Sequence, residues 1–189
     1  MKLQRDKSGQ ALLEFAFVLP MLCIFLLGVV DYGRAIYDSE VIMNLAGEGS
    51  SLASRSTSGI LATNLQGAAN VVMADAGPMA PSACTLLTAV QGTNSSGTWS
   101  YSIAGQEQPS SPTCTISVTS RIGCGPKSST CNGVATIPTG VQNALQSEPA
   151  GSYVYVTEVF YKFSYATPVG GFLGSTGTLP TDLYTVAYF

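Results

Sequence analysis

The sequence predicts an α+β protein in which a long N-terminal helix, membrane-spanning in its first part, packs on a small antiparallel sheet stapled by disulfides. Three observations predict this class. Residues 10–30 form an almost continuous apolar run, and the helical spacing of apolar residues continues beyond it. Residues 82–189 are rich in Ser, Thr, Gly and Pro and alternate between apolar and polar residues in places. The same part of the chain carries four cysteines.

The apolar run has the length and the flanking charges of a membrane-spanning helix. Its 21 residues, QALLEFAFVLPMLCIFLLGVV, occupy positions 10–30. At about 1.5 Å per residue they cross the roughly 30 Å of bilayer hydrocarbon. Lys2, Arg5 and Lys7 precede the run and Asp31 ends it. Because basic residues favour the cytoplasmic side, we expect a single pass through the inner membrane, with a cytoplasmic N-terminus and an extracytoplasmic C-terminal domain.

Helical periodicity continues after the apolar run. Beyond Asp31, apolar residues recur at helical spacing at Ala35, Ile36, Ile42, Leu45, Ala46 and Leu52. A second helical segment follows at residues 60–76, and Gly77-Pro78 supplies its end signal. Its apolar face comprises Leu61, Leu65, Ala68, Val72 and Ala76. We therefore expect residues 31–81 to continue the helix and to pack on the sheet.

Residues 82–189 carry the strand signals. Segments 85–91, 98–104 and 113–119 are candidate strands between turn-rich stretches. The clearest strand is residues 153–165, whose alternation places on one face Tyr153, Tyr155, Thr157, Val159, Tyr161, Phe163 and Tyr165. The terminal segment 183–189 offers a cross-strand match in Tyr184, Val186 and Tyr188. This tyrosine-rich face could be an adhesive or sugar-stacking surface, but we interpret it as the sheet face that covers the helix.

The five cysteines divide into Cys23, within the apolar run, and four beyond it. An even number outside a membrane anchor is typical of disulfides formed in an oxidising compartment. Zinc binding is the alternative, but the four are separated by 29, 9 and 6 residues and form no C-x2-C pair. Four cysteines allow three pairings. Closing the short loop Cys124–Cys131 leaves Cys84–Cys114 as the second disulfide.

The composition argues against catalysis and against nucleic-acid binding. The chain contains no histidine, which excludes Ser-His-Asp and Cys-His catalysis and zinc sites that use histidine. Charged residues make up 10% of the chain, and its net charge of −3 comes without the clustered Lys and Arg that nucleic acids require. We expect no catalytic residue, no cofactor and no metal site. A surface so poor in charge suits a chain packed among neighbours.

One charged residue, Glu14, lies inside the apolar run and needs an explanation. A charge in hydrocarbon costs a few kcal/mol, which neither a plain uncleaved anchor nor a signal peptide cut near Ala35 explains. A lipoprotein signal is a further alternative, but Cys23 lies in mid-span without the necessary context. If the chain is cut after Gly9 instead, the amine of Gln10 lies about one helical turn from Glu14. That amine on one subunit could then pair with Glu14 of its neighbour, so that the buried charge is satisfied when subunits pack in register.

The segment GQALLEFAFVLPMLCIFLLGVVDYGRA, residues 9–35, resembles the prepilin signal of the type IV pilin superfamily. More narrowly it resembles the TadE-like minor pilins, or pseudopilins, of tight-adherence (Tad) pilus systems. The matching positions are Gly9, Glu14-Phe15, Pro20, Gly28 and the exit Asp31-Tyr32-Gly33. A second patch, NLAGEGSSLASR at residues 44–55, is similar to the family pattern on the extended helix. The sequence departs from the family at Ser51, where members often carry arginine.

The resemblance implies how the chain is divided and processed. Residues 1–9 would be a prepilin leader, 10–30 the transmembrane helix, 31–81 its helical continuation and 82–189 a β-rich extracytoplasmic head. A prepilin peptidase would cut between Gly9 and Gln10, with Glu14 and Phe15 completing the processing site. Glu14 and Pro20 would act in assembly, Pro20 as a point where the helix bends and can loosen on leaving the membrane.

The resemblance also implies a structural function. The chain would be a minor pilin that acts in pilus priming, tip formation or surface adhesion. Its partners would be other pilin and minor pilin subunits, the prepilin peptidase and the inner-membrane assembly platform. Two alternatives remain: a static single-pass membrane protein with an extracytoplasmic binding domain, and a secreted adhesin or enzyme with an ordinary signal peptide.

Overall fold

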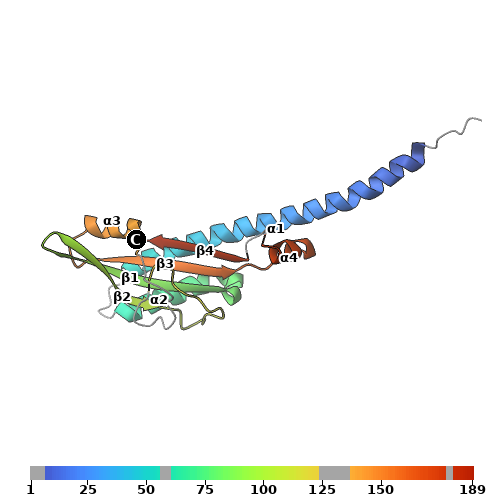
Figure 1. Cartoon of the computed structure of the whole chain (residues 1–189). Helices are drawn as coiled ribbons and strands as arrows, with labels where there is room; N and C mark the ends of the chain where they lie inside the picture. The colour runs from blue at the N-terminus through green and yellow to red at the C-terminus, as the bar shows by residue number, and fades with distance from the viewer. Residues whose placement is uncertain (1–6, 56–60, 124–136, 178–180) are drawn as a thin grey trace, which may run out of the picture. The chain divides into compact units, whose positions relative to one another are not determined.

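The computed structural model describes residues 7–55, 61–123, 137–177 and 181–189, and it confirms the α+β class (Figure 1). A long apolar N-terminal helix packs on a small antiparallel sheet. The helices are α1 (Lys7–Arg55), α2 (Leu61–Asp75), α3 (Thr139–Ser147) and α4 (Pro168–Ser175), with a 3-10 helix η1 (Gly77–Ser82). The strands are β1 (Ala83–Ser95), β2 (Thr98–Glu107), β3 (Tyr153–Lys162) and β4 (Asp182–Tyr188).

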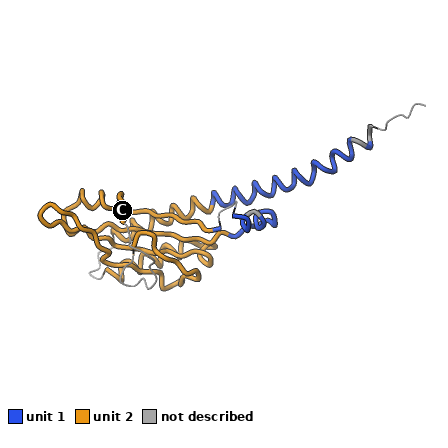
Figure 2. The backbone as a smooth tube through the Cα atoms, in the orientation of Figure 1, with its two compact units in different colours: residues 1–37, 164–181 blue, residues 38–163, 182–189 orange. Residues whose placement is uncertain are grey.

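The chain forms two compact units, shown in different colours in Figure 2. Unit 1 comprises residues 1–37 and 164–181, and therefore contains the first part of α1 together with α4. Unit 2 comprises residues 38–163 and 182–189, and contains the second part of α1, the other helices and the whole sheet. Each unit thus combines two segments that are far apart in the sequence.

The sheet of unit 2 has the order β2-β1-β3-β4, with every neighbouring pair antiparallel. Its central strand β1 is buried from Ala83 to Val90, as expected for a strand covered on both faces. A bulge between Ala89 and Val90 interrupts the pairing with β2. The predicted segments 85–91 and 98–104 lie within β1 and β2 and are confirmed as strands.

The second part of α1 and helix α2 cover one face of the sheet. A buried apolar cluster joins these helices to β1: Ala53, Leu65, Ala68, Ala69, Leu87 and Ala89. Tyr155 packs against this cluster, and Thr157 beside it is fully buried, so the tyrosine-rich face of β3 does pack on the helices as predicted. Gly49 permits the close approach, because a Cβ there would lie 2.8 Å from the Thr157 side chain.

The opposite face of the sheet is covered by α3 and by the segment that follows β2. Its apolar cluster consists of Val90, Ile122, Val141, Leu145, Val154 and Val156. Glu158 is also fully buried on this face, where its carboxylate accepts hydrogen bonds from Ser120 Oγ (2.5 Å), the Arg121 backbone N–H (2.8 Å) and Tyr184 Oη (2.9 Å). These donors satisfy a carboxylate that would be costly to bury alone.

The register of β4 corrects one prediction. Tyr184, Val186 and Tyr188 pair with Phe160, Glu158 and Val156. Directly paired residues share a face of the sheet, so these three side chains lie on the face opposite the tyrosine-rich one. The match expected between the two tyrosine sets was therefore wrong. Strand β3 also ends at Lys162, so the expected strand over residues 153–165 was too long, and Tyr165 lies in unit 1.

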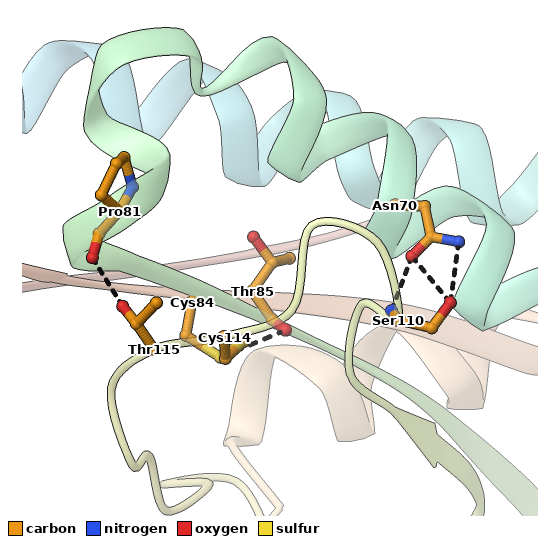
Figure 3. Close-up of a disulfide and its surroundings, with 7 residues drawn as sticks. All are labelled: Asn70, Pro81, Cys84, Thr85, Ser110, Cys114 and Thr115. Atoms are coloured by element: carbon orange, nitrogen blue, oxygen red, sulfur yellow. Dashed lines mark hydrogen bonds between the residues drawn. A yellow bond between two sulfur atoms is a disulfide. The ribbon is translucent and has the colours of Figure 1, made fainter.

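The segment after β2 is held by a disulfide and by hydrogen bonds (Figure 3). Cys84 and Cys114 are bonded, which is the predicted pair, whereas the predicted pair Cys124–Cys131 lies outside the described residues. Asn70 Oδ1 accepts from the Ser110 N–H (2.7 Å), and Thr115 Oγ1 donates to the Pro81 carbonyl (2.5 Å).

The prediction of a strand over residues 113–119 was wrong, because this segment carries no strand beyond a single bridge at Thr113. The described segment is tied to Cys84 of β1 by the disulfide and to Pro81 of η1 by a side-chain hydrogen bond, rather than by strand pairing. Tertiary contacts have therefore overridden its β-propensity.

Candidate functional site

The first part of α1 presents an apolar surface on all sides. Side chains from residue 11 to residue 27 are all exposed, including Phe17 (74%) and Met21 (76%). In the described part of the chain, α1 is the one helix long and apolar enough to cross a membrane, with a mean hydropathy of 2.5 in its apolar stretch. A helix that is apolar all round is typical of a membrane span. Unit 1 therefore contains a segment suited to a bilayer.

The residues of the predicted processing site lie together near the start of α1. The Gly9–Gln10 peptide is helical, and Gly9 is exposed with open space where a Cβ would be. Glu14 and Phe15 are exposed about one turn further on. Glu14 is the only charged residue between Lys7 and Asp31. The structure thus brings these residues into one short helical stretch, while their roles stay predictions.

Pro20 lies inside α1, which remains helical on both sides of it. Because proline has no backbone N–H, the carbonyl of Ala16 loses the hydrogen bond that would hold this turn. The missing bond gives the apolar stretch one weakened turn near its middle. The predicted role of this turn in assembly stays a prediction.

Asp31 ends the apolar run and binds the start of α4. Its side chain is fully buried within unit 1. Asp31 Oδ1 accepts from the backbone N–H groups of Ala166 (2.9 Å) and Thr167 (3.3 Å), and Oδ2 accepts from Thr167 Oγ1. Three donors on one carboxylate, two of them backbone groups, hold α4 beside α1 at this level.

The sequence of α4 fits this contact closely. Thr167 is the N-cap, and its Oγ1 accepts from the Gly170 N–H (3.1 Å), while Pro168 occupies the first helical position. A Cβ on Gly170 would overlap the Asp31 carboxylate, and one on Gly174 would overlap the ring of Tyr165. Both glycines are therefore required for α4 to approach its neighbours.

Sequence reasoning missed this contact. It interpreted Asp31 only as the end of the apolar run and assigned no helix to residues 168–175. The Thr-Pro pair at 167–168 is a helix-start signal that could have revealed α4. Its partner Asp31 is 136 residues away from Thr167, a separation that no local pattern encodes.

Side chains that could hold a metal do not gather in the described residues, where no group of three His, Cys, Asp or Glu lies close together. The α1 surface in unit 1 is instead mostly apolar. This part of the helix carries one carboxylate near its start, Glu14, and one at the end of the apolar run, Asp31. Such a surface suits lipid and other apolar helices rather than a small polar ligand.

Comparison with known families matches residues 9–50 to the family model of the TadE-like proteins. The resemblance drawn from residues 9–55 is thereby confirmed for most of its length. No curated protein and no solved structure matches the chain. The matched segment includes the whole exposed apolar stretch and Asp31. The match spans 42 of the 189 residues, all of them within α1.

Proposed function

We propose that this chain, whose residues 9–50 form a TadE-like domain, is a minor pilin of a Tad-type pilus. It is inserted in the inner membrane through residues 10–30, with the N-terminus in the cytoplasm. A prepilin peptidase cuts it after Gly9, and the assembly platform then passes it to a complex of pilin subunits that acts in priming, tip formation or surface adhesion.

The observation that carries this proposal is the exposed apolar helix within the TadE-like match. Residues 11–27 leave large apolar side chains exposed on every side of α1, which is costly in water and favourable in lipid or among other apolar helices. A pilin needs both environments in turn. The same helix surface serves the membrane before assembly and neighbouring subunits after it.

Glu14 determines the register in which subunits pack through this surface. After a cut at Gly9, the amine of Gln10 and the carboxylate of Glu14 are separated by about one helical turn. In a staggered assembly, the amine of one subunit pairs with Glu14 of the next, and out-of-register packing leaves a charge in an apolar surrounding. The carboxylate therefore favours one register over the others.

The contact at Asp31 supports this cleavage site over an ordinary signal-peptide cut near Ala35. A cut there would separate Asp31 from the rest of α1 and remove the acceptor of three hydrogen bonds from the Ala166–Thr167 segment. A cut after Gly9 leaves this contact intact.

The first test is the intact mass of the protein recovered from membrane and surface fractions, with and without the prepilin peptidase. We expect a peptidase-dependent loss of the mass of residues 1–9. Gly9→Leu should block this loss. Gly33→Leu is the matched control, since both glycines are exposed on α1 with open space around them. An uncut chain in both strains, or a chain beginning near residue 35, would overturn the proposal.

The second test concerns Glu14. Glu14→Ala should lower the amount of the protein that co-purifies with other pilus subunits by about tenfold or more, because an amine then lacks its partner in an apolar surrounding. Glu40→Ala is the control, as Glu40 is an exposed glutamate on the same helix. Equal recovery of both variants would contradict the assembly role of Glu14.

A further inference from the structure

Helix α4 leaves apolar surface exposed within unit 1. Phe172, in the middle of this helix, is 69% exposed. No Asp, Glu, Lys or Arg occurs between Lys162 and Asp182, a stretch that contains the whole of α4. A single exposed ring is common at protein surfaces, so its meaning depends on where α4 lies along α1.

The level of α4 along α1 is fixed by Asp31. The carboxylate of Asp31 accepts from the Ala166 N–H (2.9 Å) and from the Thr167 N–H (3.3 Å) immediately before the helix. Asp31 directly follows the apolar run 10–30. In a membrane-spanning α1, the start of α4 therefore lies at the level where the hydrocarbon ends.

The residues around Asp31 have the pattern of a membrane interface. Tyr32 and Tyr37 are 58% and 65% exposed on α1 just beyond the apolar run. Exposed tyrosines gather where hydrocarbon meets the headgroups, since the ring prefers the apolar side and the hydroxyl the polar side. Val29 and Val30, just before Asp31, are 53% and 52% exposed and belong to the apolar run. The apolar run contains no tyrosine, so exposed tyrosine hydroxyls first appear beyond Asp31, where Ile36 is also 46% exposed.

We propose that α4 is a membrane-interface helix that lies in the extracytoplasmic headgroup region, with Phe172 inserted among the lipid chains. The exposed side of α4 contacts lipid, because Asp31 holds α4 at the end of a continuous apolar stretch that lipid surrounds in the proposed membrane span. A short helix without charged residues can place one aromatic ring in this region without taking a charge into the hydrocarbon. This inference rests on the proposed membrane span of residues 10–30. It adds a second lipid contact, which Asp31 positions.

The test uses the full chain in phosphatidylcholine and phosphatidylglycerol vesicles with brominated acyl chains, which quench nearby tryptophan. The chain has one native tryptophan, Trp99 in β2, and Trp99→Phe supplies a background without it. Into this background, Met21→Trp reports the middle of the span and Phe172→Trp reports α4. Both positions are exposed, so an indole fits without disturbing the core.

We expect lipid brominated deep in the chain to quench Met21→Trp most strongly, and lipid brominated near the headgroup to quench Phe172→Trp about twofold or more. The native chain, which reports Trp99, gives the reference for a residue of the sheet. The Trp99→Phe chain gives the blank, and matching circular dichroism of all four chains shows that the fold is retained.

The outcomes separate this inference from the proposed function. If Met21→Trp is not quenched, the membrane span itself fails, and the inference fails with it. If Met21→Trp is quenched while Phe172→Trp behaves like Trp99, the span stands and the lipid contact of α4 is overturned. Emission from Phe172→Trp that shifts to the blue only at high protein-to-lipid ratio would assign this surface to a second copy of the chain, which also overturns the inference.

Discussion

Ile24 and Ile42 lie on the same helix, yet 54% of Ile24 is exposed and only 1% of Ile42. The first part of α1 carries large apolar residues on every side, whereas the second part buries one face against the sheet. That buried face is made of smaller and branched residues: Ile42, Leu45, Ala46, Gly49, Ser50 and Ala53. One continuous helix thus serves two environments.

This difference shows that an apolar residue of α1 is not necessarily buried within the chain. In the second part, small residues allow α1 to approach the sheet closely, and the apolar side chains of the buried face pack within the chain. In the first part, large apolar side chains are exposed on every side of the helix. Substitutions at matched positions in the two parts should therefore have unequal effects on folding.

The largest difference is expected between Ile42→Ala and Ile24→Ala. Removing the buried side chain leaves a cavity and should lower the free energy of unfolding of unit 2 by about 2–5 kcal/mol. The exposed Ile24 should change it by less than about 0.5 kcal/mol. Denaturant titration of the full chain in detergent micelles, followed by near-ultraviolet circular dichroism, measures both. Equal effects would mean that the two parts of α1 do not differ in this way.

The cysteines provide a second matched comparison. Replacing Cys84 and Cys114 together by serine removes a disulfide that spans a sequence separation of 30 residues. This should cost about 3 kcal/mol of unfolding free energy, since the open chain has more freedom when unfolded. Cys23→Ser, on the exposed part of α1, should leave the unfolding of unit 2 unchanged in the same titration. A double serine chain as stable as the native one would contradict this prediction.

Two glycines of α1 should respond with opposite signs to the same substitution. A Cβ on Gly49 would lie 2.8 Å from Thr157 and 3.0 Å from Val72, whereas Gly47 has open space around it. Gly49→Ala should destabilise unit 2 by about 1–3 kcal/mol through overpacking. Gly47→Ala should stabilise it by up to about 1 kcal/mol, because alanine favours the helix. Thermal unfolding of both variants decides this, and stabilisation by both would show that α1 and β3 are not closely packed.

The smallest effect is expected at Tyr184 and concerns the pH dependence of stability. Tyr184 lies beside the buried carboxylate of Glu158 in unit 2, whereas the apolar stretch of α1 contains one charged residue, Glu14. Burial and the nearby Glu158 carboxylate, to which Tyr184 donates a hydrogen bond, raise the pKa of Tyr184 above its ordinary value. A raised folded pKa contributes stability that is complete below about pH 10 and declines as the pH rises further. We expect the stability of the Tyr184→Phe chain to fall less steeply above pH 10.

Tyr32→Phe is the control for this pH dependence, because Tyr32 is exposed on α1. Chemical unfolding at several pH values between about 9 and 12 measures the three slopes. A Tyr184→Phe chain with the same alkaline slope as the native chain would show that this hydroxyl does not contribute.

Local signals predicted much of the fold. The apolar run and the helical spacing after it predicted α1, and the face of residues 60–76 predicted α2. Of that face, Leu65, Ala68 and Val72 are buried in α2, and Ala76 is buried just after it. Alternation predicted β3. These periodic signals succeed because helix and strand periods reflect which face of each element is buried. The Cys84–Cys114 disulfide was also predicted, from a pairing of Cys124 with Cys131 that lies outside the described residues.

The errors came from segments whose contacts are distant. Residues 113–119 alternate like a strand, but the disulfide at Cys114 and the hydrogen bond from Thr115 to Pro81 tie them to other elements. The face of β4 followed from its register against β3, which its own alternation does not specify. Both depend on pairing partners rather than on local propensity.

The sequence by itself determined the apolar helix at the N-terminus, its TadE-like character and the α+β class. Each of these depends on composition and spacing within a short stretch of chain. Only the tertiary structure decided that Asp31 accepts hydrogen bonds from the segment before α4, that Glu158 is buried among Ser120, Arg121 and Tyr184, and that Gly49 meets Thr157. A buried polar group must find its partners wherever the chain brings them, and folding brings them from positions far apart in the sequence.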